Sequence, residues 1–251
     1  MTADLNCDMG EGCGNDAELM NYVSSINIAC GFHAGDTALM RKTVELAVKK
    51  GVAIGGHPSF RDLENFGRKE MKISPDEVSE IVFYQILNLK GICEDFGTKL
   101  HHVKPHGALY NQAAKDAEIA AAIAEAVKQL DANLILYGLS GSCLISEAEK
   151  IGLQTKSEVF ADRTYQPDGS LTPRSQPNAL IHDVKLSLAQ VIQMVDTQTV
   201  TATTGEIVKL KAETICIHGD GENAVEFAKA IHKIVIHEET RSFHEVKKRN
   251  L

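Results

Sequence analysis

The chain has 251 residues and a formal net charge of −8, with no basic block and no Lys/Arg stripe interleaved with aromatic residues. Binding to nucleic acid or to an anionic membrane is therefore not expected, and the partner should be a small molecule or another protein. The hydrophobic fraction of 43% and the charged fraction of 24% are those of a globular protein, and the length suits one α/β barrel domain over 1–251.

The N-terminal segment and the cysteines point to a cytoplasmic protein. The first residues lack a basic start followed by an apolar stretch, and no later apolar run approaches the ~20 residues that span a bilayer. The six cysteines are scattered singly without a CxxC pair, which argues against a disulfide framework and against a thiolate zinc site. We therefore expect most of them to be buried as small apolar residues.

Short apolar runs typical of strands alternate with longer stretches of helical periodicity along the chain. The predicted strands cover residues 2–7, 26–30, 52–55, 101–104, 134–137, 155–160 and 214–217. The predicted helices cover 15–22, 36–50, 75–97, 116–131, 141–151, 184–196 and 222–237. Residues 199–211 instead alternate around a Thr-Gly-Glu turn, which predicts a small β-hairpin inserted outside the main sheet.

Several helix boundaries carry recognisable capping residues. Ser74 precedes Pro75 and two acidic residues, which is the pattern of an N-cap followed by a proline in the first turn. Gly51, Gly97 and Gly152 follow the ends of predicted helices, where a left-handed residue would release the chain into the next strand.

Seven strand–helix units fit either a barrel or an open doubly wound sheet, and periodicity does not separate the two. In a barrel the loops after all strands meet at one face, whereas an open sheet gathers ligands mainly at one switch point. Six of the seven predicted strands end in reactive side chains. The sequence therefore favours an irregular, TIM-like (β/α)7 barrel with a hairpin insertion.

The first strand contributes a row of polar side chains. Asp4, Asn6 and Asp8 stand at alternate positions and therefore on one side of the strand, where they can face a barrel interior. Charged residues on an inward face are costly unless they are used or paired, so Asp8 is a candidate catalytic residue and Asn6 a substrate-binding one. The alternative is an acidic turn in which Glu11 caps the next helix.

The second and third strands each end near a histidine. In NIACGFHAGD, two glycines allow a tight turn that displays His33, and Asp36 can cap the following helix. In GGHPSF, Pro58 holds His57 in an extended conformation. Each is a candidate for the site, and a buried histidine with satisfied hydrogen bonds is the alternative.

The fourth strand leads into HVKPHGALY, the densest set of proton-transfer groups in the chain. Lys104 can hold an anionic carboxylate or phosphate, and His106 titrates close enough to neutrality for general acid or base catalysis. The alternative for Lys104 is a surface cation at the end of a strand.

Two later strands complete the set. SEVFADRTY brings Glu158, Asp162 and Arg163 together, where Arg163 could clamp a carboxylate, although an internal salt bridge explains this group almost as well. CIHGDGEN places His218 ahead of a helix between glycines that permit a close backbone approach to a ligand.

Motifs for other chemistries are absent from the sequence. It contains no GxxxxGK[ST], no GxSxG and no GxGxxG between a strand and a helix, which excludes independent P-loop ATP binding, a serine-hydrolase elbow and a dinucleotide fingerprint. A divalent metal remains possible on Asp8, His33 and His57, because hydrolytic metal sites use histidine and carboxylate ligands.

With DLNCDMGEG, NIACGFHAGD, GGHPSF, KPHGALY, EVFADR and CIHGDGE in this order, the chain resembles the LamB/YcsF family over nearly all its length. The resemblance implies a barrel related to glycoside hydrolases and deacetylases. It also implies a cytosolic, ATP-dependent opening of 5-oxo-L-proline (pyroglutamate) to L-glutamate, shared with the B and C subunits of a 5-oxoprolinase. ATP would be a co-substrate of that complex, and the missing P-loop is consistent with partners that supply the ATP step.

Under this resemblance, Arg163 or Lys104 would hold the substrate carboxylate, while Asp8, His57 or His106 would activate water or protonate the leaving nitrogen. Asn6, His33 and His218 would complete the substrate contacts. Two alternatives stay open: a metal-dependent amide or sugar hydrolase that acts alone, and a non-catalytic subunit that shapes a partner's site.

Overall fold

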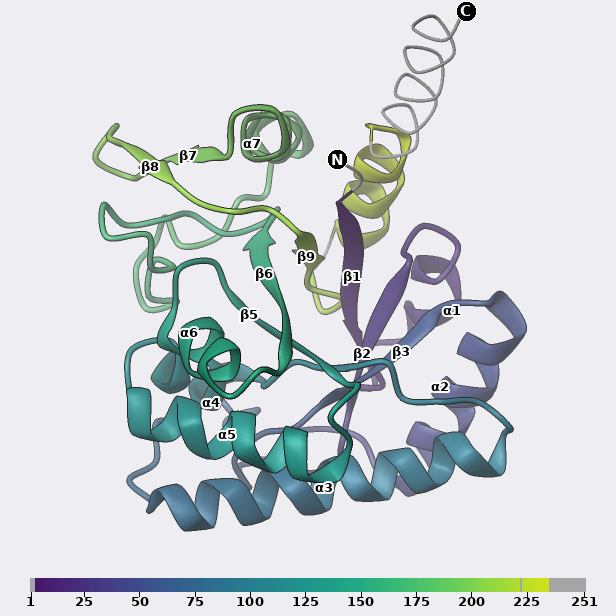
Figure 1. Cartoon of the computed structure of the whole chain (residues 1–251). Helices are drawn as coiled ribbons and strands as arrows, with labels where there is room; N and C mark the ends of the chain where they lie inside the picture. Colours follow the sequence, from purple (N-terminus) through teal and green to yellow (C-terminus); the bar gives the residue numbers. More distant parts are fainter. Residues whose placement is uncertain (1–2, 222, 235–251) are drawn as a thin grey trace, which may run out of the picture.

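The computed structural model describes residues 3–221 and 223–234, and a closed barrel of parallel strands forms its centre (Figure 1). β9 pairs with both β6 and β1, which closes the sheet. This closure confirms the predicted barrel and excludes the open sheet. The barrel strands are β1 (Asp4–Met9), β2 (Ser25–Ala29), β3 (Ala53–His57), β4 (His102–Val103), β5 (Ile135–Leu139), β6 (Gln154–Phe160) and β9 (Thr214–Ile217).

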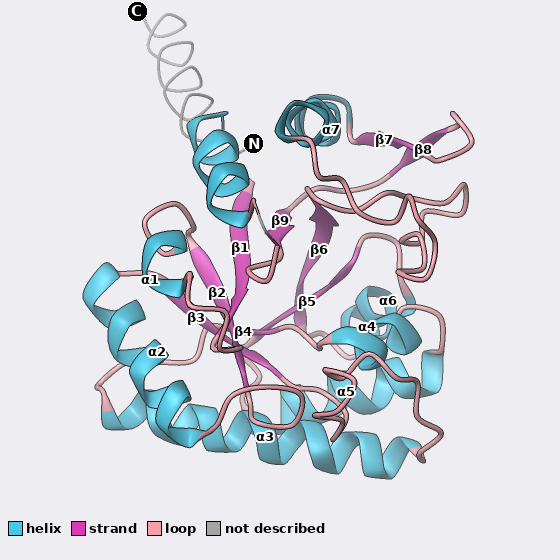
Figure 2. Cartoon of the chain, turned by 180° about the vertical axis from the view of Figure 1, so that it is seen from behind, coloured by secondary structure: helices cyan, strands magenta, loops and turns pink. Residues whose placement is uncertain are grey.

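Helices surround the barrel, with the long α3 running beside α5 on its outer side (Figures 1 and 2). In the described residues, no helix is long and apolar enough to cross a membrane. The helices are α1 (Asp16–Leu19), α2 (Thr37–Lys50), α3 (Pro75–Asp95), α4 (Gly107–Ala113), α5 (Ala117–Leu130), α6 (Cys143–Lys150) and α7 (Val184–Thr197), and residues 224–234 are also helical.

The predicted hairpin lies outside the barrel. β7 (Thr199–Thr201) and β8 (Ile207–Lys209) form a separate two-stranded antiparallel sheet beside α7 (Figure 1). Both belong to the long connection between β6 and β9, so the insertion leaves the barrel order undisturbed.

Some predicted boundaries differ from the observed ones. β1 continues to Met9 because Asp8 and Met9 still pair with β2, and position 2 of the predicted strand lies outside the described residues. The first helix is shorter than predicted, since it ends at Leu19 and residues 20–24 form a turn that leads into β2. A short helix that begins at Gly107, α4, precedes α5. Positions 222 and 235–237 of the last predicted helix also lie outside the described residues.

The predicted helix caps are confirmed. Ser74 accepts a hydrogen bond from the backbone N–H of Glu77 while the Glu77 carboxylate accepts one from the backbone N–H of Ser74. Gly51, Gly97 and Gly152 all have positive φ angles, near 70°, that fit the release of the chain after a helix.

The two faces of β1 divide the apolar core from a polar barrel interior. Leu5, Cys7 and Met9 belong to the buried apolar cluster, whereas Asn6 and Asp8 hydrogen-bond to side chains from other strands across the barrel. Barrels of this type usually fill their centre with branched apolar residues. The buried polar groups of this interior therefore need hydrogen-bond partners, which other polar side chains inside the barrel provide.

Gly55 leaves the space that the His102 ring occupies inside the barrel. A Cβ atom at position 55 would lie 2.1 Å from His102 Nε2, so alanine cannot be accommodated without moving the ring. We expect Gly55→Ala to lower the free energy of unfolding by about 1–3 kcal/mol, measured by urea denaturation. Gly91→Ala is the control, because nothing lies within 4 Å of its Cβ. Because position 91 is exposed and helical, Gly91→Ala should raise the free energy of unfolding by about 0.5–1 kcal/mol. Equal effects of the two variants would contradict the steric argument.

Candidate active site

A cavity of about 420 Å³ opens at the carboxyl ends of the barrel strands. Its walls come from segments that are far apart in the sequence and that the closed barrel brings together. Six residues predicted from sequence lie in its lining: Asp8, His57, Lys104, His106, Arg163 and His218. Of the other two, Asn6 lies deeper in the barrel, within 3.4 Å of the Lys104 ammonium, and His33 stacks on His106 with ring centroids 3.8 Å apart.

Lys104 is the centre of a buried ionic network. Its ammonium lies 2.9 Å from Asp8 Oδ1 and 3.0 Å from Glu158 Oε1, and its side chain is only 3% exposed. Burial alone would lower the pKa of Lys104, but Asp8 and Glu158 raise it well above its ordinary value. The lysine is therefore a buried cation shared by two carboxylates, which differs from the surface cation considered above.

Asp8 faces both the lysine and a histidine. Its Oδ1 accepts hydrogen bonds from Lys104 and from the Asn27 amide, 2.8 Å away, while Oδ2 lies 3.4 Å from His57 Nε2. Burial would raise the pKa of Asp8, but His57 and Lys104 hold it well below its usual range. Asp8 is therefore ionised at neutral pH and can stabilise positive charge that develops next to it.

Amide side chains connect the carboxylates below the cavity. Asn6 donates to Glu158 Oε1 at 3.0 Å, and Asn27 donates to Asn6 Oδ1 at 2.8 Å. Tyr110 donates its hydroxyl hydrogen to Glu158 Oε2 at 2.8 Å. Each oxygen of Glu158 thus has a donor, which allows a fully buried carboxylate to persist beneath the cavity.

The buried ring of His102 makes the stability of the protein depend on pH. Burial is the main cause that holds the pKa of His102 well below 6.5. The folded protein keeps this ring neutral, whereas the unfolded chain takes up a proton below pH 6.5. Stability is therefore full above that pH and falls by up to about 1.4 kcal/mol per pH unit below it. The free energy of unfolding is measured by urea denaturation at several pH values below 6.5. Its decrease per pH unit should be smaller by this amount in His102→Gln than in the unmodified chain, and an equal decrease in both would contradict the argument.

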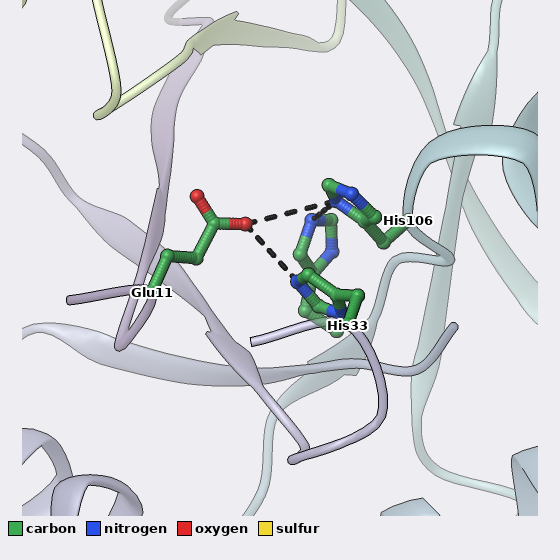
Figure 3. Close-up of side chains that lie close together, drawn as sticks. Glu11, His33 and His106 are labelled. Carbon is green, nitrogen blue, oxygen red and sulfur yellow. Dashed lines mark hydrogen bonds and ion pairs between the residues drawn. The ribbon is translucent and has the colours of Figure 1, made fainter. Parts of the chain in front are cut away.

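Three histidines and one glutamate form a second cluster beside Asp8. Figure 3 shows the Glu11 carboxylate pointing toward the rings of His33 and His106, at 3.1 Å from His33 Nε2 and 3.7 Å from His106 Nδ1. His106 Nδ1 is also 2.9 Å from His57 Nε2. Burial is the main cause that raises the pKa of Glu11 well above its usual value, and it lowers the pKa of His33 to about 2.

Two groups of side chains have metal-binding composition and spacing in the part of the chain that the structure describes. The ligand atoms of each group lie within 4.8 Å of one another; the first is Glu11, His33, His57 and His106, and the second is Asp8, Cys216 and His218. The set suggested by the sequence, Asp8, His33 and His57, is thus divided. His33 and His57 fall in the first group, and Asp8 falls in the second.

His218 and Arg163 also line the cavity. His218 Nδ1 lies 2.8 Å from Asp162 Oδ2, which orients the ring in the manner of a carboxylate–histidine pair. The Arg163 guanidinium donates to the backbone carbonyls of Thr172 and Ala179, at 2.6 and 3.2 Å. An ion pair between Arg163 and a neighbouring carboxylate, the alternative interpretation, is not found in the described residues. Arg163 instead holds the loop that contains Thr172 and Ala179 through these hydrogen bonds.

Sequence reasoning missed several residues of the site. Glu11 was considered only as a helix cap, and Arg68 and Arg174, which both line the cavity, were not considered. The segment between β3 and α3 that carries Arg68 is long and has no helix or strand, a feature that marks functional loops and could have drawn attention to it. No comparable signal precedes Arg174.

Sequence comparisons find relatives that match most of the chain. It is 57% identical to the 5-oxoprolinase A subunit of Tolumonas auensis over 230 residues, which cover 90% of this chain and 92% of that protein. It is 55% identical to the 5-oxoprolinase A subunit of Brevibacillus brevis, with 92% of each chain covered.

A solved structure with a related sequence has the same fold. The crystal structure of the lactam utilization protein from Thermus thermophilus matches with a TM-score of 0.88 and 44% identity, covering 96% of this chain and 98% of that one. The family model for LamB/YcsF matches residues 3–250. The chain therefore belongs to the LamB/YcsF family, as its motifs indicated.

Proposed function

We propose that this chain is the A subunit of an ATP-dependent 5-oxoprolinase, which opens 5-oxo-L-proline to L-glutamate together with B and C subunits. The observation that carries the proposal is the identity of more than half of the aligned residues, over about nine-tenths of the chain, to proteins named as A subunits of 5-oxoprolinase. A cavity at the carboxyl ends of barrel strands, where enzymes of this architecture place their active sites, supports it.

The chemistry needs groups that this cavity offers. A lactam is a resonance-stabilised amide, so water attacks its ring carbon slowly unless the oxygen is activated. In the proposal, ATP transfers its terminal phosphoryl group to the lactam oxygen and leaves as ADP, and one water adds to the ring carbon. The ring C–N bond of this adduct then breaks, and the nitrogen takes up a proton to become the amine of glutamate. The acyl phosphate that remains is hydrolysed by a second water to the side-chain carboxylate and inorganic phosphate. A base for water and an acid for nitrogen are therefore required.

The proposed catalytic residues are Asp8, His57 and His106, which lie together on one wall of the cavity. One of the two histidines accepts a proton from water and then passes it to the ring nitrogen. Asp8, held ionised by its neighbours, stabilises the imidazolium that forms.

The proposed substrate-binding residues are Asn6, His33, Lys104, Arg163 and His218. Since the Lys104 ammonium is shared by two carboxylates and Arg163 is held by backbone carbonyls, both act mainly by fixing the shape of the cavity. The guanidinium groups of Arg68 and Arg174 in the lining are then the direct ligands for the substrate carboxylate.

The partners and co-substrate of the proposal follow from the relatives' names and from the sequence. A name that specifies one lettered subunit implies a complex of several subunits. The chain has no P-loop motif, so B and C subunits would share the ATP step in the cytoplasm. A divalent metal belongs to the proposal as a possible companion of the histidines.

Reconstitution tests the function directly. Glutamate release from 5-oxoproline is measured with this chain alone, with B and C subunits, and with and without ATP. Release is expected only when all three subunits and ATP are present. Release by the chain alone without ATP would favour the stand-alone hydrolase, and no release under any of these conditions would overturn the proposal.

A further inference from the structure

The hydrogen bonds of His57 and His106 turn one nitrogen of each ring toward the other. His57 Nδ1 lies 2.7 Å from the carbonyl oxygen of Lys104, and His106 Nε2 lies 2.8 Å from that of Phe66. A carbonyl oxygen only accepts, so each of these nitrogens carries a hydrogen. The remaining nitrogens, His57 Nε2 and His106 Nδ1, are 2.9 Å apart. Their lone pairs repel each other at this distance unless a cation, either a proton or a metal ion, lies between them.

We propose that Glu11, His33, His57 and His106 bind a divalent transition-metal cation. The ring nitrogens of the three histidines and a carboxylate oxygen of Glu11 lie within 4.8 Å of one another. The backbone carbonyls of Lys104 and Phe66 fix the tautomers of two of the ligands, as outer partners do in metal sites. This inference rests on the proposed function and names the ligands of its divalent metal, and its test does not require 5-oxoprolinase activity.

Glu11 supplies the negative charge of the site. Its side chain is 4% exposed, and in the described residues its ion-pair partners are His33 and His106. No lysine or arginine of the described residues forms an ion pair with this carboxylate. A dication would supply the opposite charge that the buried site lacks.

One ring nitrogen of His33 makes no hydrogen bond among the residues described. This nitrogen is Nδ1, and the side chain is fully buried. The ring lies parallel to that of His106, with an interplanar angle of 6°, so both rings present an edge to the Glu11 carboxylate (Figure 3). Nε2 of the same ring already faces Glu11 at 3.1 Å.

The loop after β3 is built around this cluster. Phe66 has a φ angle of 56°, which is strained for a residue other than glycine and aims its carbonyl at His106. A Cβ atom on Gly67 would lie 2.8 Å from His33 Cβ and 2.9 Å from His106 Cδ2. The backbone is thus strained at Phe66, and position 67 has no room for a side chain beside the histidines. Both features are expected of a site held in a fixed geometry.

The ligand set selects the kind of metal. Three imidazoles and one carboxylate suit Zn²⁺, Co²⁺, Fe²⁺ or Ni²⁺, whereas Mg²⁺ and Ca²⁺ prefer oxygen ligands. Since His57 and His106 also line the cavity, the bound cation would lie at its edge and could act there as a Lewis acid.

Co²⁺ binding to the full chain tests the site without any activity measurement. The protein is stripped with a chelator, loaded with Co²⁺ and freed of excess ion, and its metal content and visible absorption are recorded. One Co²⁺ per chain with an intense visible spectrum, displaced by Zn²⁺, is expected. Glu11→Gln and His33→Asn should each weaken binding by at least about tenfold.

His101→Asn is the matched control, because His101 is an exposed histidine at the opposite end of β4. It should bind Co²⁺ like the unmodified chain, and circular dichroism checks that each variant is folded. A chain that stays free of metal after loading, as a proton shared by His57 and His106 would require, overturns the inference. Unchanged binding in both Glu11→Gln and His33→Asn overturns it as well. Neither result depends on glutamate release, so the proposed function is tested separately.

Discussion

Replacing Lys104 with methionine is expected to lower the free energy of unfolding by about 3–5 kcal/mol, because it leaves the carboxylates of Asp8 and Glu158 buried without their shared cation. These carboxylates have side chains that are 4% and 0% exposed, so water cannot replace the ammonium. Urea denaturation at neutral pH measures the loss. Methionine keeps most of the volume of lysine, which confines the effect to the missing charge.

Two further variants separate charge from packing. Adding Glu158→Gln to Lys104→Met removes one of the two unpaired charges and should restore part of the lost stability. Lys156→Met is the matched control, since Lys156 is a half-buried lysine on β6 and should change stability by about 1 kcal/mol or less. A Lys104→Met protein as stable as the Lys156→Met protein would show that the network does not depend on the lysine.

Asp8→Asn should lower kcat of the reconstituted complex by about 10²–10⁴-fold, the usual contribution of a group that assists proton transfer. Asparagine keeps the shape of the side chain and one oxygen for the Lys104 and Asn27 hydrogen bonds. It removes the negative charge that faces His57 at 3.4 Å. Glutamate release per active complex, at saturating 5-oxoproline and ATP, is the measurement.

Asp4→Asn tests whether the effect is specific to the cavity end of the barrel. Asp4 lies on the same strand and accepts hydrogen bonds from Ser25, Tyr137 and Thr214 at the opposite end. The variant should lose about 1–3 kcal/mol of stability while kcat stays near that of the unmodified chain. If Asp8→Asn also leaves kcat unchanged, this chain serves only for binding, and the catalytic groups belong to its partners.

The sequence alone determined the parts of this protein that depend on local pattern. The period-two row of Asp4, Asn6 and Asp8 put these residues on one face of β1 because successive side chains of a strand alternate. Ser74 and Gly51 marked a helix start and a helix end through their own capping preferences. Reactive residues after successive strands indicated one shared site, because parallel strands of a barrel end at one face.

The tertiary structure alone decided which of these groups touch. Lys104 pairs with Glu158, and Glu11 joins His106, across intervals of the chain that no local periodicity spans. The strand pattern fits an open sheet as well, and only the pairing of β9 with both β1 and β6 selects the barrel. The irregular loop after β3 places Phe66 through a strained backbone angle that packing imposes. Contacts of this kind depend on barrel closure and loop conformation, which are set by the whole fold and not by neighbouring residues.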